Sequence, residues 1–401
     1  MRRRQFVRGI AGLAALGLAM PTLTRRGSLR VGSVGGGIVG ASIAMHLAEA
    51  GADVVQFEKT APAAGATRNS FAWLNAFVAD RHYQALRLRS IAAYHALDGP
   101  LDLGITWGGY LNWGGDPAGA ELVNANAAQM ADTPFPVRRL TLTELSALAP
   151  SLAPGPVSAA IYSALDGHLD PVQATLRFLE HARRHGARMV CPCEIQGLDF
   201  QQGRLQAVVT NTGAVPVDRL VVAAGVDTPA LLAMAGFKLQ LRHAPGFLAH
   251  SQPTPMLTKS ICDAPGGVSF KQMADGSLVG TDSPDPPDLP AHAAIREHAV
   301  DFADEALRAW HGNRALGKVK AFLPAAGDAK LEHVTLGFRP MPTDSLPVVG
   351  AVPGVSGLYV VVTHSGVTLA PILGQYVRAE LLRGEDISDL APYRPGRFAK
   401  S

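Results

Sequence analysis

The sequence has few cysteines and no recognisable metal site. Its three cysteines, Cys191, Cys193 and Cys262, are too few and odd in number for a disulfide framework among 401 residues. A Cys-Pro-Cys stretch without a second ligand pair is a poor zinc site, so we predict no metal and treat the cysteines as small packing residues. Cys191 and Cys193 lie two apart on a predicted strand, which would place their side chains on the same face.

Charge of either sign is also scarce. Charged residues make up 17% of the chain, and the formal net charge is +3. Residues 1–19 hold four arginines and no acid, and subtracting these four charges from +3 leaves −1 for the remainder. No stripe of basic residues interleaved with aromatics is present, so we predict no nucleic-acid partner.

Repeats and disorder-prone composition are absent as well. Apolar residues make up 47% of the chain, which excludes intrinsic disorder and provides enough material for a large core. The 42 glycines and 29 prolines follow no collagen period and accompany no repeat of 20 to 50 residues, so collagen and solenoid folds are excluded. The length favours two domains.

The apolar run from Gly9 to Met20 is too short to span a bilayer comfortably. It follows Arg3-Arg4-Gln5-Phe6-Val7-Arg8, which resembles a twin-arginine export signal. We therefore predict that residues 1–27 are a leader and that the protein is periplasmic. The alternative is that translation starts at Met20 and the product is cytoplasmic. Membrane contact is expected only through this leader or through a quinone electron acceptor.

The first chemical signal is a glycine turn between a strand and a helix. The strand covers Leu29 to Val34, and the helical pattern stops at Gly51. In between, Gly35 permits a tight turn, Gly37 lets backbone amides approach a pyrophosphate, and Gly40 lets the helix lie close to the strand. This pattern predicts a dinucleotide-binding unit.

A second strand supports this interpretation. It runs from Asp53 to Phe57 and ends in Glu58, 18 residues after Gly40, where a carboxylate can accept hydrogen bonds from a ribose diol. The motif alone does not distinguish FAD from NAD.

Four further segments identify a family. Taken together they resemble the FAD-dependent D-amino-acid oxidase superfamily, which includes glycine oxidase, sarcosine oxidase and D-amino-acid dehydrogenases. The segments are Ala64-Gly65-Ala66-Thr67-Arg68-Asn69-Ser70, Asp166-Gly167-His168-Leu169-Asp170-Pro171, Leu220-Val221-Val222-Ala223-Ala224-Gly225, and the C-terminal stretch from Gly337-Phe338-Arg339-Pro340 through Leu346-Pro347-Val348-Val349-Gly350 to Thr363-His364-Ser365-Gly366.

The resemblance implies an α/β fold with a Rossmann-type FAD-binding domain, glutathione-reductase-like, and an interleaved α+β substrate domain built on an antiparallel sheet. The FAD domain is expected from residues 28–98, 155–233 and 333–401, and the substrate domain from 99–154 and 234–332. Within the inserts we predict strands at Ile105–Trp113 and Leu239–His250, a surface loop at Ser283–Asp288 and a helix at Ala291–Trp310.

The resemblance also implies FAD as the cofactor. Residues 62–80 contain no histidine and residues 335–401 no cysteine, the two positions where relatives attach the flavin covalently, so we expect non-covalent FAD. The predicted cofactor-binding residues are Gly35, Gly37, Ile38, Val39, Gly40, Glu58, Lys59, Ala66, Thr67, Asn69, Ser70, Ile195, Ala224, Gly225, Gly366, Val367 and Thr368. The last three would begin a helix whose positive end stabilises negative charge on the reduced flavin. Thr363 departs from the glycine that family members commonly have before the histidine.

Arg339 is the predicted catalytic residue. In this superfamily the matching arginine holds the substrate carboxylate, and a planar guanidinium suits that task because it can form two parallel hydrogen bonds. The implied reaction is hydride transfer from the C–N carbon of a small carboxylate-bearing amine to flavin N5, which gives an imine that hydrolyses. His364 is interpreted as part of the loop scaffold rather than as a base.

Several alternatives stay open from sequence. Trp73, Asn75, Tyr110 and His243 are candidates for the substrate pocket, although such residues on strands are more often packing residues. The electron acceptor is oxygen, a quinone or a carrier protein. A non-catalytic flavoprotein of the same fold that acts in assembly or binding is the second functional hypothesis, and an NAD-dependent dehydrogenase sharing residues 29–58 is the third.

Overall fold

The computed structural model describes residues 28–282 and 289–399. The predicted leader, residues 1–27, and the predicted surface loop Ser283–Asp288 lie outside the described residues. No helix within the described ranges is long and apolar enough to cross a membrane.

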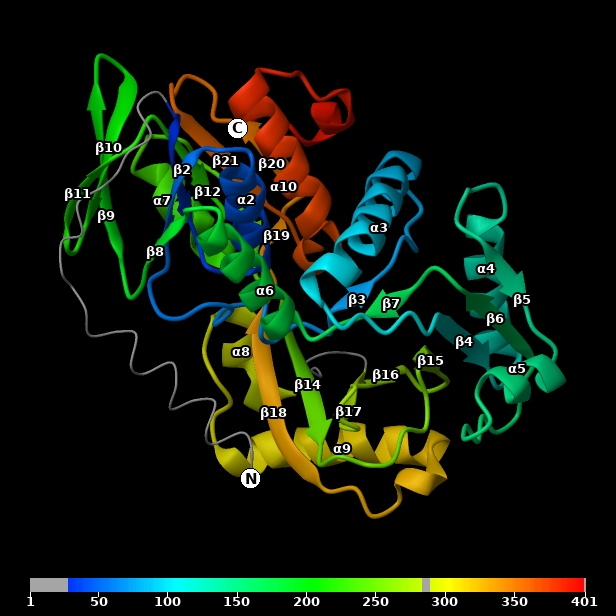
Figure 1. The fold of residues 1–401 in the computed structure, drawn as a ribbon. Helices are drawn as coiled ribbons and strands as arrows, with labels where there is room; N and C mark the ends of the chain where they lie inside the picture. Colours follow the sequence, from blue (N-terminus) through cyan, green and yellow to red (C-terminus); the bar gives the residue numbers. More distant parts are fainter. Residues whose placement is uncertain (1–27, 283–288, 400–401) are drawn as a thin grey trace.

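A six-stranded sheet forms the first half of the molecule (Figure 1). Its strands run in the order β20-β21-β12-β1-β2-β8, and all are parallel except β20, which pairs antiparallel with β21. The bounds are β1 Arg30–Val34, β2 Asp53–Phe57, β8 Arg188–Val190, β12 Arg219–Val222, β20 Val348–Ala351 and β21 Leu358–Val362. The two strands predicted on either side of the glycine turn are therefore confirmed.

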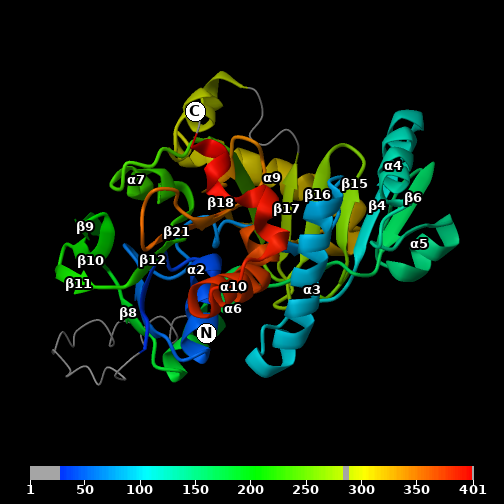
Figure 2. The same cartoon turned by 90° about the horizontal axis from the view of Figure 1, so that it is seen from above.

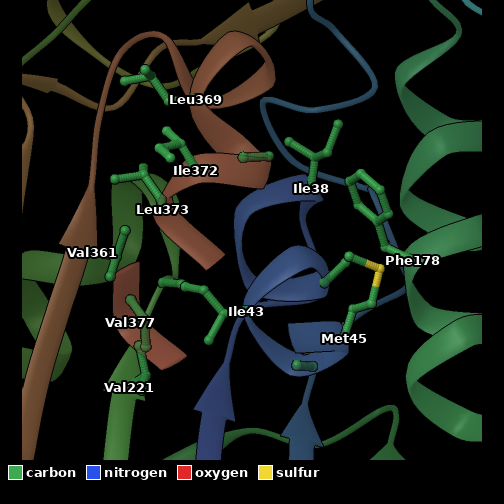
Figure 3. Close-up of a cluster of buried hydrophobic side chains, with 14 of the residues drawn as sticks. Ile38, Ile43, Met45, Phe178, Val221, Val361, Leu369, Ile372, Leu373 and Val377 are labelled. Atoms are coloured by element: carbon green, nitrogen blue, oxygen red, sulfur yellow. The ribbon is translucent and has the colours of Figure 1, made fainter. Parts of the chain in front are cut away.

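Three helices cover one face of this sheet. They are α2 Ile38–Glu49, α6 Pro171–Arg184 and α10 Gly366–Arg383, with α2 packed between the other two. Figure 3 shows Met45 of α2 beside Phe178 of α6, and the apolar side chains of α10 facing α2 and the strands. Gly374 allows the close approach of α10, because a Cβ there would lie 2.6 Å from the Ser42 hydroxyl.

The other face of the six-stranded sheet packs against a small meander. This three-stranded sheet consists of β9 Ile195–Gln201, β10 Arg204–Thr210 and β11 Gly213–Pro216, and α7 Thr228–Ala233 lies beside it. Along the central strands, Val31 and Val221 point to the helices while Val34 and Val222 point to the meander. A strand buried on both faces explains the continuous apolar runs in the sequence.

An eight-stranded sheet forms the second half, with the order β18-β14-β17-β16-β15-β4-β6-β5. Its pairs are antiparallel except for β15 with β4. α9 Glu305–Phe322 packs across β14, β16, β17 and β18, and Figure 2 shows it from above beside β16, β17 and β18. The bounds are β4 Tyr110–Gly114, β5 Val137–Arg139, β6 Ala159–Ser163, β14 Pro245–Ser251, β15 Ile261–Ala264, β16 Val268–Gln272, β17 Leu278–Asp282 and β18 Leu331–Phe338.

The remaining elements connect the two halves or extend them. The helices are α3 Arg81–Leu101, α4 Pro117–Met130, α5 Leu142–Leu148 and α8 Ala293–Glu297. The short paired strands are β3 Trp73–Leu74 with β7 Gly167–His168, and β13 Leu241–Arg242 with β19 Met341–Pro342. The mixed α/β fold class predicted from sequence is confirmed by this architecture and by the solved structures described below.

Several predicted element bounds were wrong. The helix expected at Ala291–Trp310 is a short α8 followed by α9, which begins at Glu305 because Asp304 caps it by accepting the Leu307 N–H. The first part of the strand expected at Ile105–Trp113 is not in a sheet strand, and β4 starts at Tyr110, after Gly109 at a φ of +74°. The strand expected at Leu239–His250 is divided into β13 and β14.

The cysteine prediction and the segment boundaries also differ from the structure. Cys191 and Cys193 follow β8 rather than lying in it, and only Cys193 is buried. β6 lies in the predicted FAD-domain segment 155–233, yet it pairs within the eight-stranded sheet. β18 spans the predicted boundary at 333 and belongs to the same sheet.

Candidate active site

The turn between β1 and α2 excludes side chains at two of its glycines. Gly35 has a φ of +106°, and a Cβ there would lie 2.4 Å from the Ala223 carbonyl oxygen. A Cβ on Gly40 would lie 2.0 Å from the Gly35 carbonyl oxygen. Gly37 differs, because the sole contact of a Cβ there would be the Thr67 hydroxyl at 3.1 Å. The described residues around Gly37 therefore leave a space in front of α2, and a side chain at Gly37 would fill it.

Two helices begin at this place without a side-chain cap. Neither Gly37, before α2, nor Ser365, before α10, caps through its side chain, and neither first turn contains an acid. The two helix starts are adjacent, since a Cβ on Gly366 would lie 3.1 Å from Val39 Cγ2. The Ile38 N–H of α2 donates to the Thr67 hydroxyl, while the partial positive charge of both helix starts remains. Together they favour an anionic ligand such as a pyrophosphate.

Glu58 lies at the end of β2, beside this turn. Its carboxylate accepts the Gly36 N–H at 2.7 Å and the Thr60 N–H at 2.7 Å. The Cys193 N–H donates to the Glu58 carbonyl, which brings the chain leading into Ile195 alongside. Ile195 itself is buried at the start of β9. A half-buried carboxylate next to an anion-favouring turn fits the ribose of a dinucleotide.

The predicted residues near the end of β12 lie close by. Lys59 forms an ion pair at 2.7 Å with Asp227, two residues after Gly225, so its ammonium group is engaged with protein. Ala224 contacts the glycine turn, because a Cβ on Gly35 would be 3.0 Å from its Cα.

The loop from Ala64 to Ser70 joins the glycine turn to the eight-stranded sheet. Thr67 is buried and its hydroxyl accepts the Ile38 N–H at 3.1 Å. Ala66 is half-buried, and the Ser70 hydroxyl accepts the Ala72 N–H. Asn69 meets β18, since a Cβ on Gly337 would lie 2.4 Å from Asn69 Cβ. The loop therefore lies between the predicted cofactor residues and the strand that leads to Arg339.

Arg339 follows β18 and is held by backbone. Its Nε donates to the Ala244 carbonyl at 3.3 Å and its Nη2 to the Pro245 carbonyl at 2.7 Å. Two of the five guanidinium N–H groups are thus used to fix the orientation, and the others remain for a ligand. The side chain is exposed and lines a cavity of about 430 Å³ together with Arg242, His243 and Arg296.

His364 lies close enough to three arginines to respond to their charges. Desolvation by the surrounding protein, and then the positive charges of Arg339, Arg87 and Arg242, lower the pKa of His364 to about 4. The ring still contacts solvent, so water screens part of these charges. At neutral pH His364 is therefore uncharged, and it is a weak base. This agrees with its interpretation as part of the loop scaffold.

Arg87 was missed by the sequence analysis. It is 6% exposed, lies on α3 and donates to the Asn75 side chain at 2.7 Å and to the Ser365 hydroxyl. Its guanidinium carbon lies 4.5 Å from the Tyr83 ring centroid. A buried arginine at the start of α10 adds positive charge where that helix begins. The sequence offers no signal for the burial of Arg87, because an arginine in a polar helix is expected to be solvent-exposed.

Two of the four pocket candidates lie together. The rings of Trp73 and Tyr110 have centroids 4.7 Å apart. The Trp73 indole donates to Asp166 at 2.7 Å, and the Tyr110 hydroxyl donates to Asp263 at 2.7 Å. Asn75 is bound to Arg87, whereas His243 lines the cavity beside Arg339.

Lys271 is a second residue that the sequence analysis missed. It is 1% exposed, its ammonium group donates to the Leu169 carbonyl at 3.4 Å, and it lies 5.3 Å from the Phe71 ring centroid. Burial lowers the pKa of Lys271 to about 7. Phe71 directly follows the loop that ends at Ser70, so a titratable group is buried beside the candidate cofactor site.

Comparison with known proteins supports the predicted resemblance. A family model described as FAD dependent oxidoreductase matches residues 34–380. The uncharacterized oxidoreductase YurR of Bacillus subtilis is 28% identical over 382 residues, which cover 90% of this chain and 97% of the relative. Rat mitochondrial dimethylglycine dehydrogenase is 27% identical over 92% of this chain, and the match spans 44% of that longer protein.

Solved structures share the fold. The glycine oxidase of Geobacillus kaustophilus superposes with a TM-score of 0.80 at 23% identity, covering 92% of this chain and 98% of that chain. L-proline dehydrogenase from P. horikoshii gives a TM-score of 0.81 at 21% identity, covering 93% and 98%.

Proposed function

Because this chain belongs to the family of FAD-dependent oxidoreductases, we propose that it oxidises the C–N bond of a small amino acid or N-methyl amino acid. The observation that carries the proposal is Arg339. Its guanidinium is held by two backbone carbonyls at a cavity with a basic lining, directly after the strand that contacts Asn69. The names of two relatives, glycine oxidase and dimethylglycine dehydrogenase, agree with this substrate class.

FAD supplies the two-electron acceptor, since a bound flavin takes a hydride from the carbon next to nitrogen. Gly37, Ile38 and Val39 would hold its pyrophosphate, and Glu58 its ribose. We propose the same contribution for the remaining cofactor residues of the sequence analysis, and non-covalent attachment.

The protein's own groups would act mainly by positioning. Arg339 would bind the substrate carboxylate and fix the Cα–H, and such fixed geometry supplies much of the acceleration. The backbone N–H groups of Gly366, Val367 and Thr368 would stabilise negative charge that develops near the start of α10. Burial and the neighbouring arginines lower the pKa of His364 to about 4, so its imidazole binds a proton too weakly to take the amine proton. The imine product would hydrolyse to an oxo acid and an amine or ammonia, or, for an N-methyl substrate, to formaldehyde and the demethylated amine.

Anaerobic flavin bleaching tests the proposal directly. The purified flavoprotein is mixed with glycine, sarcosine, dimethylglycine, proline and both enantiomers of other amino acids, and flavin absorbance is followed. Bleaching by at least one of them supports the proposal. Flavin that none of them reduces would favour the non-catalytic role. Reoxidation of bleached enzyme with oxygen or a quinone then identifies the class of electron acceptor.

Replacement of Gly37 tests the placement of the pyrophosphate. Gly37→Val should purify without flavin, because its side chain would fill the space before α2, where the Thr67 hydroxyl would lie 3.1 Å from the new Cβ. Gly317→Ala is the matched control, since a Cβ there has nothing within 4 Å. A Gly37→Val protein that keeps its full flavin content would show that the pyrophosphate binds elsewhere.

A further inference from the structure

The cavity at Arg339 has a basic lining. Its described lining residues are Arg242, His243, Ala244, Pro245, Arg296, Arg339 and Met341. This set includes three arginines and no aspartate or glutamate. A single substrate carboxylate would satisfy Arg339, so the guanidinium of Arg242 is positive charge beyond what the proposed function requires.

Arg242 lies on the backbone that faces Arg339. β13 pairs with β19, with Arg242 opposite Met341, and the Arg339 N–H donates to the Ala244 carbonyl. The Arg242 guanidinium donates to the Ser345 hydroxyl, which is a neutral partner. Both arginines line the same cavity, and the charges of both act on His364.

Asp344, the acidic residue that follows β19 in the sequence, already has a basic partner. Asp344 accepts from Arg397 at 2.7 Å and does not neutralise Arg242. Arginines elsewhere in the described structure have carboxylate partners, as Arg30 has with Asp218 and Arg394 with Glu380. Like charges at one recess repel each other, and an anion bound between them removes that cost.

We propose that the substrate carries two acidic groups, of which Arg339 binds the one next to the reacting carbon and Arg242 binds the other. The proposal rests on the function proposed above and narrows its substrate to amino dicarboxylates or N-carboxyalkyl amino acids. A cavity of about 430 Å³ has room for such a small dianion. The second charge selects against substrates such as glycine or sarcosine, which have one acidic group.

Binding of acids that cannot be oxidised tests, without turnover, whether the cavity prefers a ligand with two acidic groups. Thermal unfolding of the flavoprotein is measured with succinate, and with propionate as the matched monoanion. The apparent affinity for succinate should be roughly tenfold higher, since a hydrogen-bonded charge contributes about that factor. Arg242→Gln should reduce the ratio to near one. Arg184→Gln is the control, because Arg184 pairs with Glu180 on the surface of α6. Equal stabilisation by the two acids in the wild type, or none by either, overturns the proposal.

Anaerobic flavin reduction separates this proposal from the proposed function. Aspartate and glutamate enantiomers and iminodiacetate are compared with alanine, glycine and sarcosine. Preferred reduction by the dicarboxylates, lost in Arg242→Gln, supports both proposals. Reduction by the monocarboxylates alone overturns the proposal of a second acidic group on the substrate and still supports the proposed oxidation of the C–N bond. If neither these compounds nor the wider panel used to test the proposed function reduce the flavin, the proposed function fails, and the succinate and propionate comparison still decides whether the cavity binds a dianion.

Discussion

Both faces of the central strands β4, β15 and β16 of the eight-stranded sheet are largely buried, yet their chemistry differs. The face toward α9 is apolar, with Leu111, Trp113 and Phe270 packed in one cluster. The opposite face presents Tyr110, Asp263 and Lys271, which are side chains that can ionise. Because side chains alternate along a strand, neighbours such as Phe270 and Lys271 belong to opposite faces.

The comparison separates stability from function. Burial of the apolar face contributes stability, whereas buried polar groups are unfavourable unless hydrogen bonds satisfy them. Thr281 Oγ1 is buried and has no hydrogen-bond partner among the described residues. The polar face also meets Phe71 and Trp73, next to the candidate cofactor loop. We infer that this face is kept polar for the reaction at a cost in stability.

The largest expected effect comes from the apolar face. Phe270 is fully buried and stacks with Phe322 of α9 at a centroid distance of 6.4 Å. Phe270→Ala should lower the free energy of unfolding by about 3–5 kcal/mol, because it removes buried area and leaves a cavity. Urea unfolding measures this, with Val209→Ala on the exposed β10 position as control. A loss as small as the control's would contradict the assignment of this face to stability.

Arg339, at the end of this sheet, should affect binding rather than folding. Arg339→Leu should weaken substrate binding by about 1.5–3 kcal/mol, or roughly ten- to a hundredfold, since it removes a charged hydrogen-bond donor. Arg339→Lys should restore part of the affinity but not the two-pronged geometry, so the rate of flavin reduction at saturation should stay low. Stopped-flow reduction against substrate concentration measures both quantities. Normal kinetics in Arg339→Leu would place the carboxylate elsewhere.

Replacement of Lys271 should increase the free energy of unfolding, whereas replacement of Phe270 should decrease it. Lys271→Met should raise the free energy of unfolding by about 2 kcal/mol at neutral pH, because it removes a buried group that is costly to charge. The wild-type lysine has a folded pKa of about 7, below its ordinary 10.5, so the unfolded chain binds more protons between these values. Wild-type stability should therefore rise with pH across that window, and the gain from methionine should shrink there. Lys238→Met on the surface is the control, and a destabilised Lys271→Met protein would refute the prediction.

The same contrast explains what could be predicted from the sequence. The glycine turn, β1, β2 and the start of α10 were predicted because local motifs encode them: Gly35 and Gly40 have no space for a side chain. Lys271 could not be predicted, since the alternation Ser269-Phe270-Lys271 is typical of a half-exposed strand. The strand is covered on both faces only because the six-stranded half meets it, which is a long-range packing event.

Side-chain partners across the molecule were equally beyond the sequence. Arg87 reaches Ser365 over a separation of 278 residues, and Arg242 and Arg339 meet through strand pairing. The family resemblance predicts a role for Arg339 because its motif is local, and that role stays a prediction. The resemblance did not predict the charged residues around Arg339, because their positions depend on long-range packing.

The smallest expected effect concerns Asp166, the acid that the Trp73 indole contacts. Burial raises the pKa of Asp166 to about 7, although hydrogen bonds from the Ser163 and Trp73 side chains oppose this. The folded protein then holds a proton that the unfolded chain has released, so wild-type stability should fall as pH rises from about 4 to about 7. Asp166→Asn keeps an acceptor for the indole and cannot titrate. The variant should therefore be more stable than the wild type by about 1 kcal/mol above this window and should lose the advantage at acidic pH. Urea unfolding across the window measures the difference, with Asp199→Asn on the surface as control. If the free energy of unfolding of Asp166→Asn depends on pH as that of the wild type does, Asp166 is ionised in the folded protein at neutral pH. The polar face then costs the protein little stability at this position.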